Sequence, residues 1–295
     1  MSAVIPEDGE AAPEQIKVLF TLHPGMDSLD FIGPLEVLSH ARHNIKDPES
    51  KAFTFTFAAD SEHVVSAQGA SFRAHIDYKE AMRRLAEFDV VVVPGGGVEQ
   101  VMKTKGAQPM PLIKAFADLQ IKNPSRERTL MAVCTGSLYL AELGLLAGLS
   151  ATTHPDYITK MEIICSKAAQ RDLAERTDVM EERYVVNNLR FDLGENEDEN
   201  PYIRRRSDAG GRRPSNARKG SSSWQESNKR RESITKRMGL KLGGLRVITT
   251  SGITSGLDSA LYLVSALVDL ESANEAARIM CYEWNKGVVV KGLDV

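Results

Sequence analysis

Short apolar runs that alternate with helical stretches constrain the fold of this chain more than any other feature. The runs IKVLFTL (16–22), FTFTFAA (53–59), DVVVV (89–93) and TLMAV (129–133) are predicted strands, and amphipathic stretches separate them. Strands that are almost wholly apolar and alternate with helices are typical of a parallel sheet covered on both faces. The sequence therefore predicts an α/β domain with a mostly parallel sheet.

Later segments continue the same alternation. RYVV (183–186) and LRVITT (245–250) are two further predicted strands. Helices are expected from Asp30 or Pro34 onward, over 78–88, 110–122, 135–148 and 255–270, and from Ser272, with Ser272 as N-cap and Glu275 three residues on.

Composition narrows the function classes. The net charge of -3 does not favour a protein that coats nucleic acid or an anionic membrane, and no apolar run reaches the roughly 20 residues that span a bilayer. Three scattered cysteines do not suit a disulfide framework or a zinc site, so we expect no metal, no cofactor and a reducing, cytoplasmic location.

Two segments depart from the globular pattern. Residues 1–15 read as a disordered leader, and 188–242 as a charged, largely disordered insertion between the domain parts 16–187 and 243–295. RRRS and RRES in the insertion offer Ser207 and Ser233 to basophilic kinases, and the basic clusters leave a nuclear address or nucleic-acid contact open. A solvated loop without a role is the simpler interpretation.

Cys134 lies where a predicted strand turns into a helix. A cysteine on such a turn is expected to be exposed above the helix N-terminus, where the dipole would favour the thiolate. Gly96 and Gly97 follow the neighbouring strand and could direct backbone N–H groups to the same point as an oxyanion site. The alternative is a buried cysteine that acts as a small hydrophobe.

Five motifs in order resemble the ThiJ/PfpI superfamily, relatives of class I glutamine amidotransferases: LDFIGPLEVL, VVVPGGG, AVCTGSLYLAELGLLAG, ATTHP and VITTSGITSGLDSALYLVSAL. The resemblance implies a flavodoxin-like three-layer sandwich, usually a homodimer, with Cys134 as the nucleophile. It also implies that Asp30 hydrogen-bonds the thiol.

Details of these motifs are most similar to isocyanide hydratases, which add water to an isonitrile to give an N-substituted formamide. In that interpretation Cys134 attacks the substrate carbon, Asp30 transfers the proton, and Thr135 and Gly96 position the intermediate. Ser251, Gly252 and Ile253 would line the pocket. The long insertion and Pro155 after His154 depart from that branch.

Other interpretations stay open. The protein could act on reactive carbonyls or sense oxidation through Cys134, or it could be a non-catalytic binding module. His154 could lie near the thiol or be structural, and His23 and Glu36 are minor candidates for the site. Cys165 and Cys281 are expected to be inert on helical faces. The glycines 95–97 lack the lysine and hydroxyl of a nucleotide loop, so a nucleotide site is rejected.

Overall fold

An eight-stranded sheet forms the centre of the molecule. The computed structural model describes residues 14–123, 126–187 and 245–290, and the predicted leader and insertion lie almost wholly outside them. The sheet has the order β12-β10-β11-β7-β6-β1-β2-β5. Its strands are β1 (Ile16–Thr21), β2 (Phe53–Ala59), β5 (Ile76–Asp77), β6 (Val90–Val93), β7 (Arg128–Ala132), β10 (Tyr184–Asn187), β11 (Leu245–Thr250) and β12 (Val288–Val290).

The sheet is mostly parallel, as predicted. The six strands from β11 to β5 run in one direction, and β10 pairs antiparallel with β11 while β12 runs parallel to β10. Two short pairs lie outside this sheet: β3 (His63–Val65) with β4 (Ser71–Arg73), and β8 (Ser150–Ala151) with β9 (Asp178–Val179).

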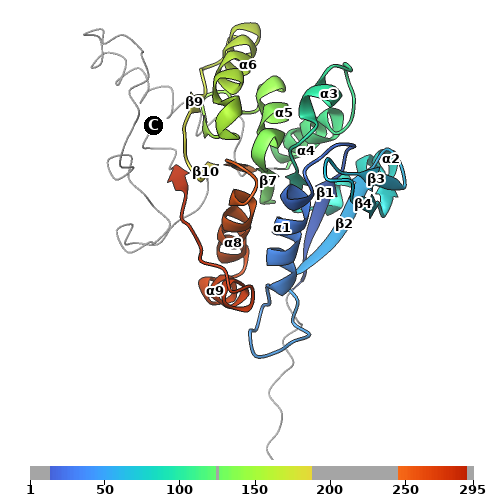
Figure 1. Cartoon of the computed structure of the whole chain (residues 1–295), viewed down its shortest axis with the longest axis vertical. Coiled ribbons are helices and arrows are strands. Elements are labelled where there is room, and N and C mark those ends of the chain that lie inside the picture. The colour runs from blue at the N-terminus through green and yellow to red at the C-terminus, as the bar shows by residue number, and fades with distance from the viewer. Residues whose placement is uncertain (1–13, 124–125, 188–244, 291–295) are drawn as a thin grey trace, which may run out of the picture.

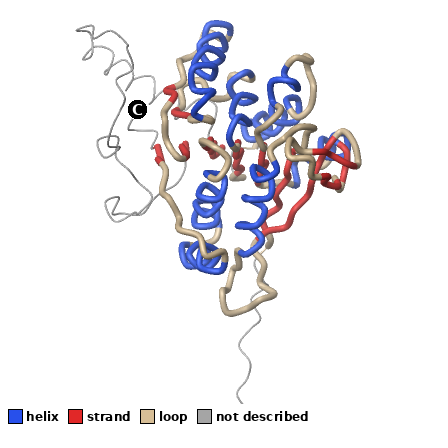
Figure 2. Tube along the Cα trace, in the orientation of Figure 1, coloured by secondary structure: helices blue, strands red, loops and turns tan. Residues whose placement is uncertain are grey.

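Helices cover both faces, which gives the predicted three layers (Figures 1 and 2). Successive residues of a strand face opposite sides: Val18 and Phe20 belong to one buried cluster, and Leu19 to the other. The first cluster contains side chains of α1 (Ser28–His40), α8 (Ser255–Leu267) and α9 (Leu270–Ile279). The second contains side chains of α2 (Tyr78–Arg83), α3 (Val98–Met102), α4 (Met110–Lys122), α5 (Ser137–Glu142) and α6 (Ile158–Arg171).

Several helices differ from the sequence prediction at their ends, among them α2, which ends at Arg83, and α8, which ends at Leu267. Helix α1 begins at Ser28 rather than near Asp30 or Pro34, because the Asp27 side chain accepts the Leu29 N–H and caps the helix. Helix α9 is capped by Asp269, whose carboxylate accepts the Ser272 N–H, so Ser272 is not the cap. Helix α5 ends at Glu142, two residues before Gly144, which has a positive φ of 73°.

No helix within these described residues combines the length and apolarity that crossing a bilayer requires. The same residues contain no group of three or more His, Cys, Asp or Glu side chains arranged to hold a metal ion.

Candidate active site

The ends of three neighbouring strands bring the predicted site residues together. Strands β1, β6 and β7 are adjacent and parallel, so the segments that follow them leave the same edge of the sheet. The segment after β1 leads to Asp30 in the first turn of α1, β6 leads to the glycines 95–97, and β7 leads to Cys134. The segments that follow these three strands therefore bring Asp30, the glycines 95–97 and Cys134 close together.

Cys134 is the first residue of a 3₁₀ turn, Cys134–Gly136, that follows directly after β7 and Val133. Its φ is +55°, a left-handed conformation that is uncommon outside glycine and is found where a nucleophile is presented on a strand-to-helix turn. Its N–H donates to Thr250 Oγ1 at 3.1 Å, and its carbonyl accepts the hydroxyls of Ser137 and Thr153. A Cβ on Gly136 would lie 2.5 Å from the Val93 oxygen, so this turn needs a glycine there.

Asp30 is fully buried next to the thiol. Its Oδ2 accepts the Gly95 N–H at 3.0 Å, and its buried Oδ1 accepts no hydrogen bond from the described residues. The Cys134 thiol lies against this carboxyl and favours its charged form. Burial, together with the charge of Asp27, raises the pKa of Asp30 to about 7, although the Gly95 N–H and the thiol both favour the charged carboxylate.

The sequence predicted an exposed Cys134 with a lowered pKa, and the structure shows the opposite for both properties. Cys134 is only 5% exposed, and burial and the adjacent Asp30 charge raise its pKa to about 12. The backbone N–H of Thr135 lowers the pKa, but not enough to outweigh them. The helix that follows, α5, has only six residues, so its dipole adds little. At neutral pH the resting group is therefore a thiol beside a carboxyl.

Thr135 and the glycine loop bind each other. The Gly96 N–H donates to Thr135 Oγ1 at 2.9 Å, so this N–H, predicted to point at an intermediate, already has an acceptor. A Cβ on Gly95 would lie within 2.9 Å of both Thr135 and Asp30. Gly97 is exposed and begins α3 with a φ of +59°.

His154 and the loop 251–253 lie beside this centre and contact each other. A Cβ on Gly252 would lie 3.5 Å from His154 Cδ2, while the Ser251 N–H donates to the Arg183 carbonyl and Ile253 packs on the core. His154 Nδ1 accepts the Asp156 N–H and caps a 3₁₀ turn. Among the described residues, no hydrogen bond joins His154 or Ser251 to Cys134 or Asp30.

The minor candidates named from the sequence lie in different surroundings. His23 is 2% exposed, and its Nε2 lies 2.8 Å from the Gly96 carbonyl. Glu36 is exposed and pairs with His40. Cys165 is buried on α6, whereas Cys281 is exposed two residues beyond the end of α9 rather than on a helical face. Thr250 and Thr153, which hydrogen-bond the Cys134 backbone, were not predicted, although each directly precedes a predicted residue, and Gly95 was considered only as part of a nucleotide loop.

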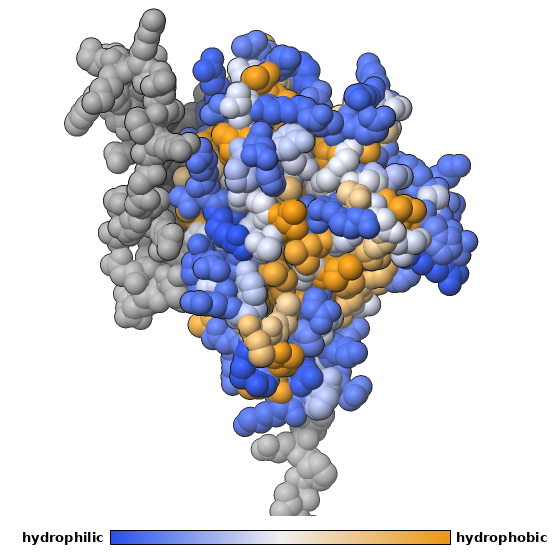
Figure 3. Space-filling view, in the orientation of Figure 1, coloured by the Kyte–Doolittle hydropathy of each residue, from blue (hydrophilic) through white to orange (hydrophobic). Residues whose placement is uncertain are grey.

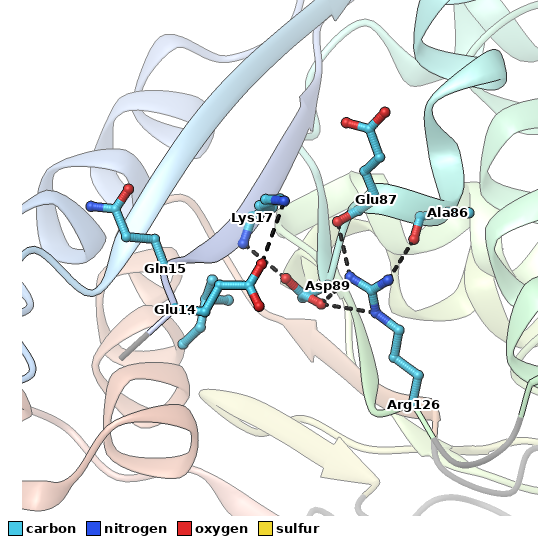
Figure 4. Close-up of a pocket in the computed structure, with 8 residues that line it drawn as sticks. Glu14, Gln15, Lys17, Ala86, Glu87, Asp89 and Arg126 are labelled. Atoms are coloured by element: carbon cyan, nitrogen blue, oxygen red, sulfur yellow. Dashed lines mark hydrogen bonds and ion pairs between the residues drawn. The ribbon is translucent and has the colours of Figure 1, made fainter. Parts of the chain in front are cut away.

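A cavity of about 570 Å³ lies at the opposite edge of the sheet (Figure 4). Its lining includes Lys17 at the start of β1, Asp89 just before β6, and Arg126. The Arg126 guanidinium binds Asp89 at 2.6 Å and the carbonyls of Ala86 and Glu87, so its donors already hold the protein together. This cavity is separate from the edge that carries Cys134.

Comparison with known proteins agrees with this geometry. The DJ-1/PfpI family profile matches residues 16–188, more than half of the 295-residue chain. The chain belongs to the DJ-1/PfpI family.

Two curated relatives of this DJ-1/PfpI chain are about equally similar. An isonitrile hydratase of Pseudomonas putida is 30% identical over 143 residues, which are 48% of this chain and 54% of the hydratase. The match thus spans about half the length of that enzyme. A Streptomyces lividans protein named for the cpoL 5′ region is 32% identical over 149 residues, 49% of this chain and 89% of that protein.

Solved structures support the DJ-1/PfpI fold. A ThiJ/PfpI family protein of Pseudomonas syringae has a TM-score of 0.51 at 18% identity, covering 96% of this chain and 83% of its own. DJ-1beta of Drosophila melanogaster has a TM-score of 0.53 at 17% identity, covering 92% and 100%. At these identities the comparison concerns the fold alone.

The pairing of Asp30 with Cys134 in this DJ-1/PfpI protein can be measured without a substrate. Asp30→Asn removes the negative charge beside the sulfur, so the pKa of Cys134 should fall by about one unit. The measurement is the rate of Cys134 alkylation by iodoacetamide against pH, read at that residue by mass spectrometry. Asp156→Asn, at an exposed carboxylate, is the control and should leave the rate unchanged. A pKa of Cys134 that rises or stays constant in Asp30→Asn would contradict the pairing.

Proposed function

We propose that the protein is a cysteine-dependent hydro-lyase of isocyanide hydratase type, which adds water to an isonitrile to give an N-substituted formamide. The single observation that carries the proposal is the buried pair of Asp30 and Cys134, in which a carboxyl with a pKa near 7 lies against a thiol. The similarity to an isonitrile hydratase over half of each chain supports the same reaction.

The first step forms a carbon–sulfur bond. The ionised Asp30 takes the thiol proton as the sulfur attacks the terminal isonitrile carbon, and the same carboxyl then delivers that proton to the carbon. The product is a thioimidate, R–N=CH–S–Cys134. A carboxylate base is needed because the thiol does not ionise by itself near neutral pH.

The second step releases the formamide. Water adds to the thioimidate carbon while Asp30 moves one proton from water to the nitrogen, which gives R–NH–CH(OH)–S–Cys134. The hydroxyl proton then passes to the sulfur as the carbon–sulfur bond breaks, and R–NH–CHO leaves. Cys134 and Asp30 return to their starting states, so the net reaction consumes only isonitrile and water.

Backbone N–H groups would orient the reacting atoms. The Thr135 N–H faces the sulfur, and the Gly97 N–H makes no hydrogen bond among the described residues. The Gly96 N–H serves Thr135 instead. Ser251, Gly252, Ile253 and His154 would contact the substituent R, and the closeness of Gly252 to His154 supports this role.

The surrounding charge favours an uncharged substrate. Among the described residues, the charges that shift the pKa values of Asp30 and Cys134 are carboxylates, and no lysine or arginine contributes. An anionic substrate would therefore meet negative charge without a compensating cation. Oxidation sensing fits less well, since it requires an exposed, low-pKa thiolate.

A panel assay tests the reaction itself. Wild-type protein should form the formamide from an alkyl isocyanide and consume methylglyoxal much more slowly, while Cys134→Ser should lose hydration by about a thousandfold or more because the nucleophile is gone. Product formation is followed by NMR. Cys281→Ser, at an exposed thiol, is the control and should retain full activity. Equal hydration by Cys134→Ser and wild type would reject the proposal.

The pH dependence follows from the pKa of Asp30. Only the ionised carboxylate can accept the thiol proton, so kcat/KM should rise with pH through about 7 and fall below it as Asp30 binds a proton. Asp27→Asn keeps a capping side chain but removes the charge that raises the pKa of Asp30, so it should move this midpoint to lower pH. A flat profile across pH 7, or an upward shift in Asp27→Asn, would contradict this role.

We also propose that the protein acts as a homodimer. Leu29 and Ile32 lie one turn apart on α1 and are each 38% exposed. Apolar side chains gather near the centre of the face shown in Figure 3, over which α1 runs in Figure 1. Sedimentation velocity should give the mass of two chains, and the double substitution Leu29→Glu with Ile32→Glu should give one. Leu173→Glu, at a 94% exposed leucine outside the helices, should leave the dimer intact. A monomeric wild type would reject the dimer, and a dimeric double variant would reject this interface.

A further inference from the structure

The dipeptide Gly95–Gly96 connects the two side chains that flank the thiol, and each of its four backbone polar groups has a partner. The Gly95 N–H donates to Asp30 Oδ2 at 3.0 Å, and the Gly96 N–H donates to Thr135 Oγ1 at 2.9 Å. The Gly95 carbonyl accepts the Asp27 N–H at 2.9 Å. The fourth partner is a side chain to which the reaction assigns no role: His23 Nε2 lies 2.8 Å from the Gly96 carbonyl.

His23 is a donor with a fixed tautomer. A carbonyl oxygen only accepts, so Nε2 must carry the hydrogen. The ring is 2% exposed and stands edge-on to Tyr139, with 5.7 Å between the ring centroids. Burial lowers the pKa of His23, so the imidazole stays neutral, and its buried Nδ1 accepts no hydrogen bond from the described residues. The only hydrogen bond of this ring in the described structure is the one to Gly96.

The loop needs such an external contact. Gly96 and Gly97 have φ values of +75° and +59°, and a Cβ on Gly96 would lie 2.4 Å from the Asp27 nitrogen. Glycine is required for that close approach, but glycine also has the least conformational preference of its own. Hydrogen bonds from neighbouring segments must therefore hold the loop in place.

One of these bonds also sets the direction of a free N–H. The peptide bond between Gly96 and Gly97 is trans, so its carbonyl and its N–H point in opposite directions. Because His23 holds the Gly96 carbonyl on one side, the Gly97 N–H is directed to the other side. A rotation of this peptide plane would break the bond to His23 and turn the Gly97 N–H away from its present direction.

We propose that His23 is a positioning residue: by donating from Nε2 to the Gly96 carbonyl, it holds the glycine loop in the conformation in which the Gly95 N–H binds Asp30 and the Gly96 N–H binds Thr135. Measuring the effect of His23 on kcat rests on the proposed function, because it needs the hydration reaction. The pH dependence of Cys134 alkylation does not need that reaction and tests His23 independently.

The test compares three substitutions with similar burial. His23→Leu removes the donor, and His23→Gln places an amide N–H where Nε2 was. Tyr139→Phe removes only the hydroxyl of the neighbouring ring. We expect His23→Leu to lower kcat by about tenfold, the size of one lost hydrogen bond, with a smaller change in KM. His23→Gln should recover most of this loss, and Tyr139→Phe should leave kcat unchanged.

The pH profile separates positioning from loss of stability. A loosened Gly95 N–H stabilises the Asp30 carboxylate less, so the midpoint of the profile should move to higher pH in His23→Leu and stay in place in His23→Gln. If His23→Leu does not fold, His23→Asn takes its place, because its amide is too short to reach Gly96. If the protein hydrates no isonitrile, the proposed function fails, and the pH dependence of Cys134 alkylation in the same variants still tests His23.

Either of two outcomes would overturn the role of His23. One is an unchanged pH midpoint and unchanged rate in a folded His23→Leu or His23→Asn protein. The other is a His23→Gln protein as impaired as His23→Leu, which would mean that the shape of the ring, not its N–H, matters.

Discussion

A carboxyl and a thiol buried against each other are the interaction on which the rest of the site depends. Burial disfavours the charged form of both groups, and the Asp30 charge further raises the pKa of the Cys134 thiol. Each group also has one backbone N–H that favours its charged form, Gly95 for Asp30 and Thr135 for Cys134. Because a carboxyl is the stronger acid to begin with, the two pKa values stay apart, at about 7 for Asp30 and about 12 for Cys134. Above about pH 7 the pair therefore holds one proton, on the sulfur, with the ionised Asp30 carboxylate beside it as a base.

The sheet makes this pair possible. Asp30 and Cys134 are more than a hundred residues apart, but β1 and β7 flank β6, and the glycine loop after β6 occupies the space between them. Side chains at the loop would prevent this, since a Cβ on Gly95 would collide with both Thr135 and Asp30. The glycines therefore serve close approach rather than phosphate binding, which is why the loop lacks nucleotide-binding residues.

The sequence predicted the fold well because period and apolarity are local properties. The valine run over 90–93 needs cover on both faces whatever its neighbours are, and β6 is buried throughout. The thiolate prediction was wrong because burial and the Asp30 charge arise only in three dimensions. The helix start expected near Asp30 or Pro34 lies at Ser28 instead, because the Asp27 carboxylate accepts the Leu29 N–H at 3.0 Å. Likewise, His23 and Gly96 are 73 residues apart in the sequence, and no sequence pattern predicts their hydrogen bond.

The number of proton carriers limits the chemistry that such a site can perform. Few groups beside the thiol can carry a proton, since the Thr135 hydroxyl accepts the Gly96 N–H, and His154 has no hydrogen bond to the thiol among the described residues. Asp30 must then take and return every proton itself. A reaction suits this arrangement when Cys134 and Asp30 have the same protonation states before and after turnover, and when the reaction involves no oxidation or reduction. Hydration of a neutral triple bond meets that condition, because each proton that leaves sulfur or water ends on the product or returns to the sulfur.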